Sequence, residues 1–409
     1  MIVRGFTARL YPAPEQAARL NQWVGGLRFL WNRLRERETA EYAATGKFLW
    51  KRELQPIAVA MKKAPETEWL ADLPAHAVLD VVARMDGALR KMVKDRKAGR
   101  KCGFPKPKKK FVNEAGIYCV GQATTLADRQ VRAPKIGAIK MRGGRLPEGR
   151  LLNARIWRDG ARWMLSAQIE CERPEPLPST GETVGLDLGV STLVTAFDGV
   201  GFDEPKAPRH LRKSLKRLRR AQRALSRRHK GSARRRAQAR KVGVLHRKAR
   251  ERRKNILHQI SHRLTAKADV VKVESLNVRG MLRNRRLALS VADAGMSRLV
   301  TFLAYKADWR GRRVEKIDPW FPSSQTCSCC GAINVAMRDL SRRVFICPTC
   351  GFVEGRDRNA ARNIYWYGQE GRNRAREGAT DGEIGVHDGA CSARVPVDEP
   401  SISAGVGSC

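Results

Sequence analysis

Apolar residues recur at helical spacing through most of the first hundred positions of the chain. Before them, the alternating stretch IVRGFTARLYP predicts a strand that ends at a proline. The stretch PEQAARLNQWVGGLRFLWNRLRERETAEY then predicts a helix with Pro14 near its start, and Gly25–Gly26 is a candidate break into two helices. Another helix is predicted from about His76 to Asp95. The N-terminal part is therefore expected to be one strand followed by helices.

The pattern changes to alternation from about residue 115 to residue 175. The stretch LLNARIWRDGARWMLSAQIECE predicts a hairpin that turns at Asp159–Gly160. A domain boundary is expected just after it, at three prolines (Pro174, Pro176 and Pro178). Beyond the boundary, TVGLDLGVSTLVTAFDG predicts a strand, a glycine turn and a second strand. A later stretch, ADVVKVESLNV, predicts a buried strand, and residues 296 to 311 predict a helix.

Between these strands lies a long basic segment, residues 206–254. It holds 23 Lys or Arg and a single acid, Glu251. Leucines at helical spacing precede a Lys-Gly-Ser turn at residues 230–232, and the segment is predicted to form two long helices in a hairpin (Leu211, Leu215, Leu218 and Leu225). A charged, solvated face is the plain alternative. A run with so few acids would repel itself, however, so a bound polyanion is the better interpretation.

The composition of the whole chain supports a polyanionic partner. The 409 residues include 81 Lys or Arg against 40 acids, a net charge of +41, which points to nucleic acid. This length predicts two to four domains. The sequence has no apolar run of about 18 residues and no signal-peptide pattern at its start, so we expect a cytoplasmic, nucleoid-associated protein without a membrane partner. The stretch KAGRKCGFPKPKKKF predicts a basic linker that touches phosphate, and the tail after residue 370 predicts disorder.

The cysteines supply the strongest single motif. Five of the ten lie between Cys327 and Cys350, and four of these form two C-x-x-C pairs, each followed by a glycine. This spacing is typical of a zinc ribbon, in which two knuckles present four thiolates to one structural Zn²⁺. The predicted ligands are Cys327, Cys330, Cys347 and Cys350. Cys329 falls out of register and is not among them.

Acidic residues in apolar surroundings form the second, more dispersed signal. Asp187 lies within the predicted strand VGLDLGV, and Glu274 ends the apolar run DVVKVES. An acid in a buried strand is costly unless it is paired or binds a metal, so the two suggest a shared divalent site. Asp357, at the start of a predicted helix, would be the third carboxylate. Hydrolysis of phosphodiesters commonly uses two metal ions about 4 Å apart on such oxygen ligands. Taken singly, each acid is equally compatible with a sheet edge or a helix N-terminus.

Other chemistry is not supported by the sequence. The seven histidines form no metal-binding pattern, and no Walker loop or Ser/His/Asp arrangement is present. Six tryptophans are candidates for base stacking, but core packing is the more frequent role of such residues, so none is assigned (Trp31, Trp50, Trp157, Trp163, Trp309 and Trp320).

Together these motifs resemble the TnpB family, the insertion-sequence-encoded RNA-guided nucleases related to compact type V CRISPR effectors. The likeness extends from RLYP to about residue 367. GLDLGVSTLVT resembles the first RuvC motif of the family, VVKVESLNVRGM the second and RDRNAARNI the third. SSQTCSCCG and CPTCG resemble its zinc-ribbon insertion, and GFPKPKKK and NRRLALSVADAG resemble further stretches. The family often has an acid two positions before the third catalytic Asp, where this chain has Gly355.

The resemblance implies an α/β and α+β multidomain protein. Its core would be an RNase-H-like (RuvC) nuclease that holds two Mg²⁺ ions on Asp187, Glu274 and Asp357. The implied domains are a β-barrel (wedge) domain, a helical recognition lobe, a basic linker, the nuclease domain with its basic hairpin, the zinc ribbon and a disordered tail. The β-barrel domain is expected at 1–10 and 112–175, the recognition lobe at 11–100 and the basic linker at 101–111. The nuclease domain is expected at 180–325 and 352–370, with its hairpin at 206–254. The zinc ribbon is expected at 326–351 and the disordered tail at 371–409.

The resemblance also implies a function. A noncoding guide RNA would direct the protein to double-stranded DNA beside a short flanking motif, and the RuvC-like site would cut that DNA by two-metal-ion hydrolysis. One alternative is an RNA-guided DNA-binding repressor that has lost cutting, although such a descendant should lack at least one of the three acids. A strand-transfer transposase would use the same carboxylates. A plain basic zinc-ribbon protein would leave the two strand acids unexplained.

Overall fold

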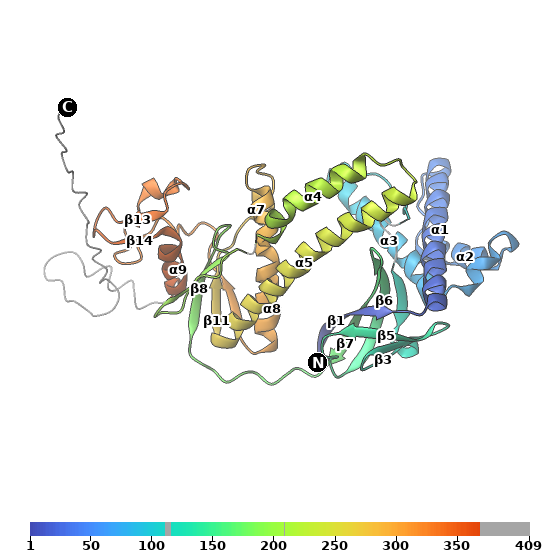
Figure 1. Ribbon diagram of the computed structural model, residues 1–409, viewed down its shortest axis with the longest axis horizontal. Helices are drawn as coiled ribbons and strands as arrows, with labels where there is room; N and C mark the ends of the chain where they lie inside the picture. The colour runs from blue at the N-terminus through green and yellow to red at the C-terminus, as the bar shows by residue number, and fades with distance from the viewer. Residues whose placement is uncertain (111–115, 208, 369–409) are drawn as a thin grey trace, which may run out of the picture. The chain divides into compact units, whose positions relative to one another are not determined.

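The computed structural model describes residues 1–110, 116–207 and 209–368 of the chain (Figure 1). The described residues form two compact units, the first spanning Met1–Arg173 and the second beginning at Pro174. The boundary therefore falls at the first of the three prolines that mark it in the sequence. The predicted disordered tail, 371–409, lies outside the described residues, as do residues 111–115, where the basic linker was expected to meet the barrel.

The helices of the first unit are α1 (Pro14–Thr45), α2 (Lys51–Lys63), the 3₁₀ helix η1 (Pro65–Asp72) and α3 (Ala75–Lys97). The expected break at Gly25–Gly26 is wrong, because α1 is continuous through both residues. Packing explains the second glycine: a Cβ on Gly26 would lie 3.0 Å from the Leu73 side chain and 3.3 Å from that of Leu70. The absence of a side chain at Gly26 thus allows α1 to pack closely against Leu70 of η1 and against Leu73.

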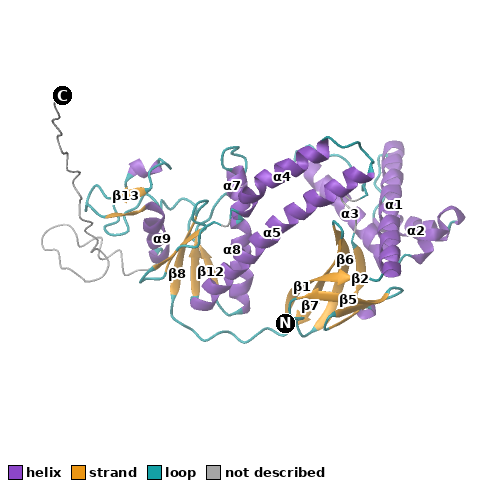
Figure 2. Cartoon of the chain, viewed as in Figure 1, coloured by secondary structure: helices purple, strands orange, loops and turns teal. Residues whose placement is uncertain are grey.

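The first unit also contains one antiparallel seven-stranded sheet, drawn in orange in Figure 2. Its strands are β1 (Ile2–Tyr11), β2 (Ile117–Val120), β3 (Thr125–Ala127), β4 (Gln130–Ala133), β5 (Gly137–Gly143), β6 (Arg150–Asp159) and β7 (Arg162–Cys171). They lie in the order β2-β6-β7-β1-β5-β4-β3. Only the short η2 (Gly121–Ala123) links the two outermost strands, β2 and β3, so the sheet must curl into a half-barrel. The predicted β6–β7 hairpin is confirmed, with Asp159 paired to Arg162.

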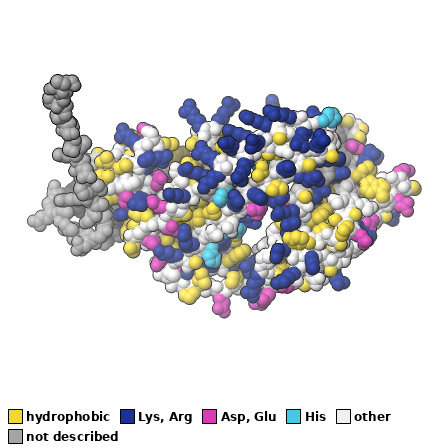
Figure 3. Space-filling model, in the orientation of Figure 1, with side chains coloured by type: hydrophobic (Ala, Val, Ile, Leu, Met, Phe, Trp, Pro, Cys, Tyr) yellow, Lys and Arg dark blue, Asp and Glu magenta, His cyan; other side chains and the backbone are white. Residues whose placement is uncertain are grey.

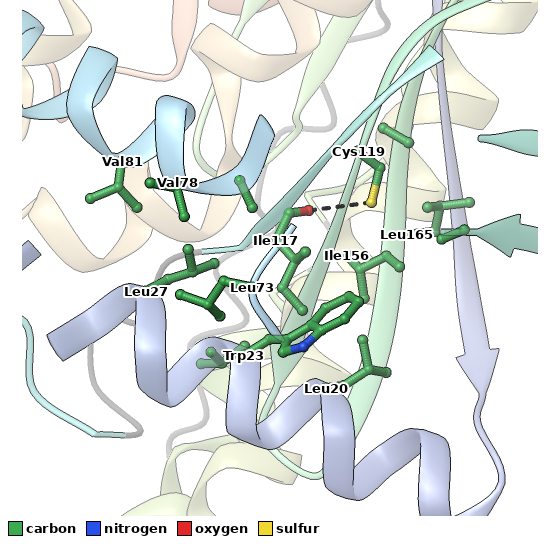
Figure 4. Close-up of a cluster of buried hydrophobic side chains, with 14 of the residues drawn as sticks. Leu20, Trp23, Leu27, Leu73, Val78, Val81, Ile117, Cys119, Ile156 and Leu165 are labelled. Carbon is green, nitrogen blue, oxygen red and sulfur yellow. Dashed lines mark hydrogen bonds between the residues drawn. The ribbon is translucent and has the colours of Figure 1, made fainter. Parts of the chain in front are cut away.

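Helix α1 packs its apolar side against the inner face of this sheet (Figure 4). Leu20, Trp23 and Leu27 of α1 are buried in one cluster with Ile117 of β2 and Ile156 of β6. Burying apolar surface stabilises the fold by roughly 25 cal/mol per Å², so large side chains such as Trp23 contribute most. The helices and the half-barrel therefore share one core.

The described part of the basic linker, residues 101–110, lies along α1. The indole Nε1 of Trp31 donates to the carbonyl of Lys106 at 3.2 Å, and Arg35 Nε donates to the carbonyl of Pro105 at 2.7 Å. Asn32 and Lys108 exchange two further hydrogen bonds, at 2.8 and 3.2 Å. These bonds fix the backbone of the segment while its lysines add positive charge to this surface.

The second unit is built on a mixed five-stranded sheet. Its strands are β8 (Thr183–Leu188), β9 (Val194–Phe197), β10 (Phe202–Asp203), β11 (Val270–Val273) and β12 (Arg313–Lys316). They lie in the order β10-β9-β8-β11-β12; the first three are antiparallel, and β11 and β12 run parallel to β8. The predicted strand–turn–strand is thus confirmed as β8 and β9.

Helices cover both faces of this sheet (Figure 1). The predicted basic hairpin is confirmed as α4 (His210–Ser226) and α5 (Ala233–Lys267), and the predicted helix at 296–311 as α8 (Met296–Trp309). The remaining elements are α6 (Val278–Met281), α7 (Ala288–Ala294), η3 (Val335–Arg338), β13 (Val344–Ile346), β14 (Val353–Gly355) and α9 (Arg356–Trp366). Apolar residues of α5 and α8 pack on one face of the sheet, and α9 lies on the other.

Candidate metal centres and nucleic-acid surface

Asp187 and Glu274 face α9 because side chains alternate along a strand. Val184, Leu186 and Leu188 of β8 point into the core with α5 and α8, so Gly185 and Asp187 point to the opposite face. Val271 and Val273 of β11 belong to the same core, which places Lys272 and Glu274 on the α9 face as well. Figure 1 shows β8 and β11 side by side with α9 next to β8.

The register of β8 and β11 brings the two acids level with each other. The last pair of the parallel register is Val273 opposite Leu186. Glu274 and Asp187 are the next residues on the two adjacent strands, so they lie side by side. Adjacent strands lie about 4.8 Å apart. The two acids predicted from separate motifs, which lie 87 positions apart in the chain, therefore meet at the carboxyl edge of the sheet.

Asp357 arrives at this edge on α9. It lies in the first turn of the helix, whose N-cap is Gly355. The helix is seated on β8 at Gly185, where a Cβ would come within 2.3 Å of the backbone nitrogen of Tyr365 and 2.5 Å of the carbonyl oxygen of Ala361. Such a close approach of helix and strand requires glycine at this position.

Electrostatics shows that the three carboxyl groups are neighbours. Burial raises the pKa of Asp187 well above its ordinary value, and the charges of Glu274 and Asp357 raise it further. Burial also raises the pKa of Glu274, and the charge of Asp357 adds to that rise. Among the described residues, the group of Cys, His, Asp and Glu ligand atoms that is spaced to hold a metal ion is the cysteine cluster treated below.

Two residues that the sequence did not single out act on this carboxylate group, one through its charge and one through a hydrogen bond. The buried Arg356 lowers the pKa of both Asp187 and Glu274, and its guanidinium donates to the carbonyl of Asp339 at 3.1 Å and to Ser324 Oγ at 3.2 Å. Ser323 Oγ donates to Glu274 Oε1 at 2.8 Å. Neither contact is visible in the sequence, because each links positions far apart along the chain.

Two asparagines fasten α9 to the chain that enters the zinc ribbon. Asn359 donates to the carbonyl of Thr326 at 2.8 Å and accepts from the backbone N–H of Ser328 at 2.9 Å. Asn363 donates to the carbonyls of Ser323 and Thr326, at 2.8 and 2.6 Å. Both asparagines are buried, where a lost hydrogen bond costs about 1–3 kcal/mol. The segment that orients Glu274 is thereby also the segment that holds α9.

The predicted zinc ligands converge. The Sγ atoms of the four cysteines all lie within 4.8 Å of one another (Cys327, Cys330, Cys347 and Cys350). Two opposite pairs are 3.5 and 3.7 Å apart. A tetrahedron with Zn–S bonds of about 2.3 Å has edges of about 3.8 Å, so the thiol group fits one Zn²⁺. Four thiolates leave no open position, so a metal here would be structural.

Each knuckle turns on a glycine. Gly331 and Gly351 have φ values of 82° and 69°, a region that favours glycine, and their N–H groups donate to the carbonyls of Cys327 and Cys347. Burial by itself would raise the pKa of the Cys347 thiol, but the N–H groups of Cys350 and Thr349 and neighbouring thiols lower it to about 7. A thiolate, the form that binds zinc, is thus accessible near neutral pH.

The basic hairpin presents its charge on the surface. Figure 3 shows Lys and Arg side chains gathered over α4 and α5. Leu218 faces the partner helix, and Gln238 Nε2 of α5 donates to the carbonyl of Ala221 at 2.9 Å, which fixes the pairing. A groove of about 1120 Å³ on α4 is lined mostly by cations (Arg212, Lys216, Arg217, Arg219, Arg220, Arg223 and Arg227). The helix has no acid, so this surface suits a run of phosphates.

Comparison with known proteins places the chain in a family. Residues 166–285 match the OrfB/IS605 family model, described as "Probable transposase", residues 297–364 match the Cas12f1-like TNB domain, and residues 1–47 match a helix-turn-helix model. A Streptomyces pristinaespiralis protein is 33% identical over 367 residues, covering 89% of each chain. InsQ of Escherichia coli K12 is 30% identical over 377 residues, covering 88% of this chain and 91% of that protein. The chain belongs to the TnpB family.

The TnpB assignment agrees with the resemblance carried by the sequence motifs. The names of both relatives describe RNA-guided DNA endonucleases. A solved structure entitled mini-RNA-guided endonuclease CRISPR-Cas_phi3 is similar with a TM-score of 0.45 and 10% identity, over 89% of this chain and 92% of that one. The region matched by the helix-turn-helix model is here the strand β1 followed by the single helix α1. Within the described ranges, no helix is both long and apolar enough to cross a membrane.

Proposed function

We propose that this chain is an RNA-guided DNA endonuclease of a transposable element. One observation carries the proposal: three acids from three separate motifs lie at one edge of a sheet, close enough to raise the pKa of Asp187. Clustered acids in partly buried positions are unfavourable unless a cation joins them. The names of the two full-length relatives support the same activity.

The donor set fits Mg²⁺, a hard cation that prefers carboxylate oxygens. Asp187, Glu274 and Asp357 would hold the metal, and we propose two ions. Bound Mg²⁺ would polarise the scissile phosphodiester and lower the pKa of the attacking water. The chain's own groups would prepare the site: Ser323 orients Glu274, and Arg356 offsets part of the negative charge.

The nucleic-acid partners follow from the charge and from the family. We propose that the α4–α5 hairpin and the linker of residues 101–110 bind the phosphate backbones of a noncoding guide RNA and of its hybrid with target DNA. Base pairing would then read the target sequence, and the half-barrel with helices α1–α3 would read a short flanking motif on double-stranded DNA. In this assignment the second unit supplies the RuvC-like nuclease, acting at the nucleoid, and the cysteine cluster a structural Zn²⁺.

A cleavage assay on the protein purified with its own RNA tests the proposal. Target DNA should be cut in Mg²⁺ but not in its absence, and Asp187→Ala should abolish cutting because it removes a metal ligand. Glu175→Ala is the control, since Glu175 is an exposed acid after the last strand of the half-barrel and outside the proposed site. The assignment is wrong if the Asp187→Ala protein cuts as fast as the parent.

Strand transfer is the second candidate, because the matching family model is described as a transposase. The same three carboxylates could serve that chemistry. Incubating the protein with element ends and target DNA separates the two activities. Joined ends, formed by this protein alone, would favour transposition, and cut but unjoined DNA would favour the nuclease.

A further inference from the structure

Trp320 differs from the other aromatic side chains of the protein. Of the tryptophans considered for base stacking, Trp31 and Trp163 are buried, as the usual core role predicts. Trp320 is 89% exposed, whereas no other Trp, Tyr or Phe among the described residues exceeds the 44% of Trp69. An exposed apolar residue is common on protein surfaces, but Trp is enriched at binding interfaces, where its large ring can be covered by a partner.

Hydrogen bonds join both ends of the loop that carries Trp320 to the chain around Glu274. At its start, the N–H of Ile317 donates to the carbonyl of Val273 at 3.0 Å, and Ser275 Oγ donates to the carbonyl of Ile317 at 2.6 Å. At its end, Ser323 Oγ donates to Glu274 itself. The loop therefore leaves and rejoins the sheet next to a predicted metal ligand.

The loop is also well braced internally. Its sequence is Asp-Pro-Trp-Phe-Pro, and the two prolines fix their own φ angles. The N–H of Trp320 donates to Asp318 Oδ1 at 2.7 Å, and the ring of Phe321 packs edge-on against Tyr367 at 5.0 Å. A braced loop can hold an exposed ring in place with little loss of conformational entropy on binding.

The reach of this loop limits where Trp320 can act. Trp320 and Ser323 are three positions apart in the chain, so their Cα atoms are at most about 11 Å apart. That distance equals about three stacked nucleotides at 3.4 Å each. A strand that has a phosphate at the carboxylates and runs toward this loop would come within reach of the indole.

We propose that Trp320 is a substrate-positioning residue that stacks on one nucleobase of the DNA strand being cut, within about three nucleotides of the scissile phosphate. The inference rests on the proposed nuclease function. Stacking suits a programmable nuclease, because every base offers a π-face and the contact is therefore tolerant of sequence. The occupant is nucleic acid and not an apolar partner, given the charge of +41 on the chain.

Single abasic nucleotides can locate this contact. The protein purified with its RNA is given target DNAs that each lack one base near the cut, and single-turnover cleavage rates are measured. For the parent, one position should slow cleavage on the order of 10-fold, because one stacked base is lost. Trp320→Ala should slow cleavage of intact DNA by a similar factor and show no further loss at that position. Trp320→Phe should restore most of the rate.

Leu340→Ala is the matched control, since Leu340 is another exposed apolar residue, 65% exposed, on the zinc-ribbon side of the loop. It should cleave like the parent. The inference is overturned if Trp320→Ala cuts intact DNA at the parental rate, or if it keeps the full abasic penalty at the same position. If either of these results is found while cleavage by the parent still depends on Asp187, the nuclease proposal stands and the Trp320 inference falls. A parent that cuts nothing refutes both.

Discussion

The seat of α9 on β8 can be tested with a single methyl group at Gly185. A Cβ there would lie 2.3 Å from the Tyr365 nitrogen and 2.5 Å from the Ala361 carbonyl oxygen. Ordinary van der Waals contact begins near 3.4 Å, so Gly185→Ala must push the helix outward by about 1 Å. Overpacking of this kind costs about 1–3 kcal/mol of unfolding free energy. The protein should therefore fold, with α9 displaced.

The displacement would carry Asp357 away from Asp187. A misplacement of about 1 Å in a catalytic group can cost about 10²-fold in rate, so we expect a loss of that size in single-turnover cleavage. Thermal unfolding should be measured beside it to confirm that the variant is folded. Gly87→Ala is the control, because a Cβ on that helical glycine meets nothing within 4 Å. A folded Gly185→Ala protein that cleaves at the parental rate would show that this contact does not place Asp357.

Three further predictions concern the same region. In zinc-loaded protein without added Mg²⁺, Asp187→Asn should be more stable than the parent. Because the folded-state pKa of Asp187 is raised, the parent loses stability as the pH rises above the ordinary pKa of 3.8. The difference in melting temperature should therefore widen between about pH 4 and neutrality, and a constant difference would contradict this. Cys330→Ser should lose bound zinc, measured by mass spectrometry, and lower cleavage on the order of 10²-fold. The control is Cys171→Ser, a buried cysteine at the end of β7 outside the cluster, which should do neither. Gly355→Asp should change the cleavage rate less than about 10-fold. A Cβ at this position would meet only the Arg358 side chain, at 3.9 Å, and Asp is a favourable N-cap residue. Abolished cleavage would mean that the start of α9 has another role.

The features that the sequence predicted well are those with a local signal. The two C-x-x-C pairs determine a thiolate cluster by spacing alone, and the four Sγ atoms do converge. The alternation in VGLDLGV and DVVKVES identifies the face on which each acid lies, because a strand has a period of two. The long basic helices were likewise visible from leucines at helical spacing, as α4 and α5 confirm.

The features that the sequence missed depend on contacts between distant positions. The pairing that sets Glu274 level with Asp187 joins strands separated by the whole α4–α5 hairpin, and no local pattern fixes that register. The roles of Ser323 and Arg356 depend on the same meeting of segments. The expected break at Gly25–Gly26 failed for a related reason, because a helical glycine can serve close packing as well as a turn.

The cysteine cluster and the carboxylate group are joined through one segment, although a metal held by four thiolates would take no part in chemistry. Cys327 directly follows Thr326, whose carbonyl accepts hydrogen bonds from both asparagines of α9. Loss of the metal would free the first knuckle and, with it, the carbonyl that anchors the helix bearing Asp357. The same segment includes Ser323, so Glu274 would lose its orienting hydrogen bond together with its partner carboxylate. A metal bound by the cysteines would thus bear on two of the three acids through the five residues from Ser323 to Cys327, which is why its removal should lower the rate of cleavage and not merely the stability of a peripheral module.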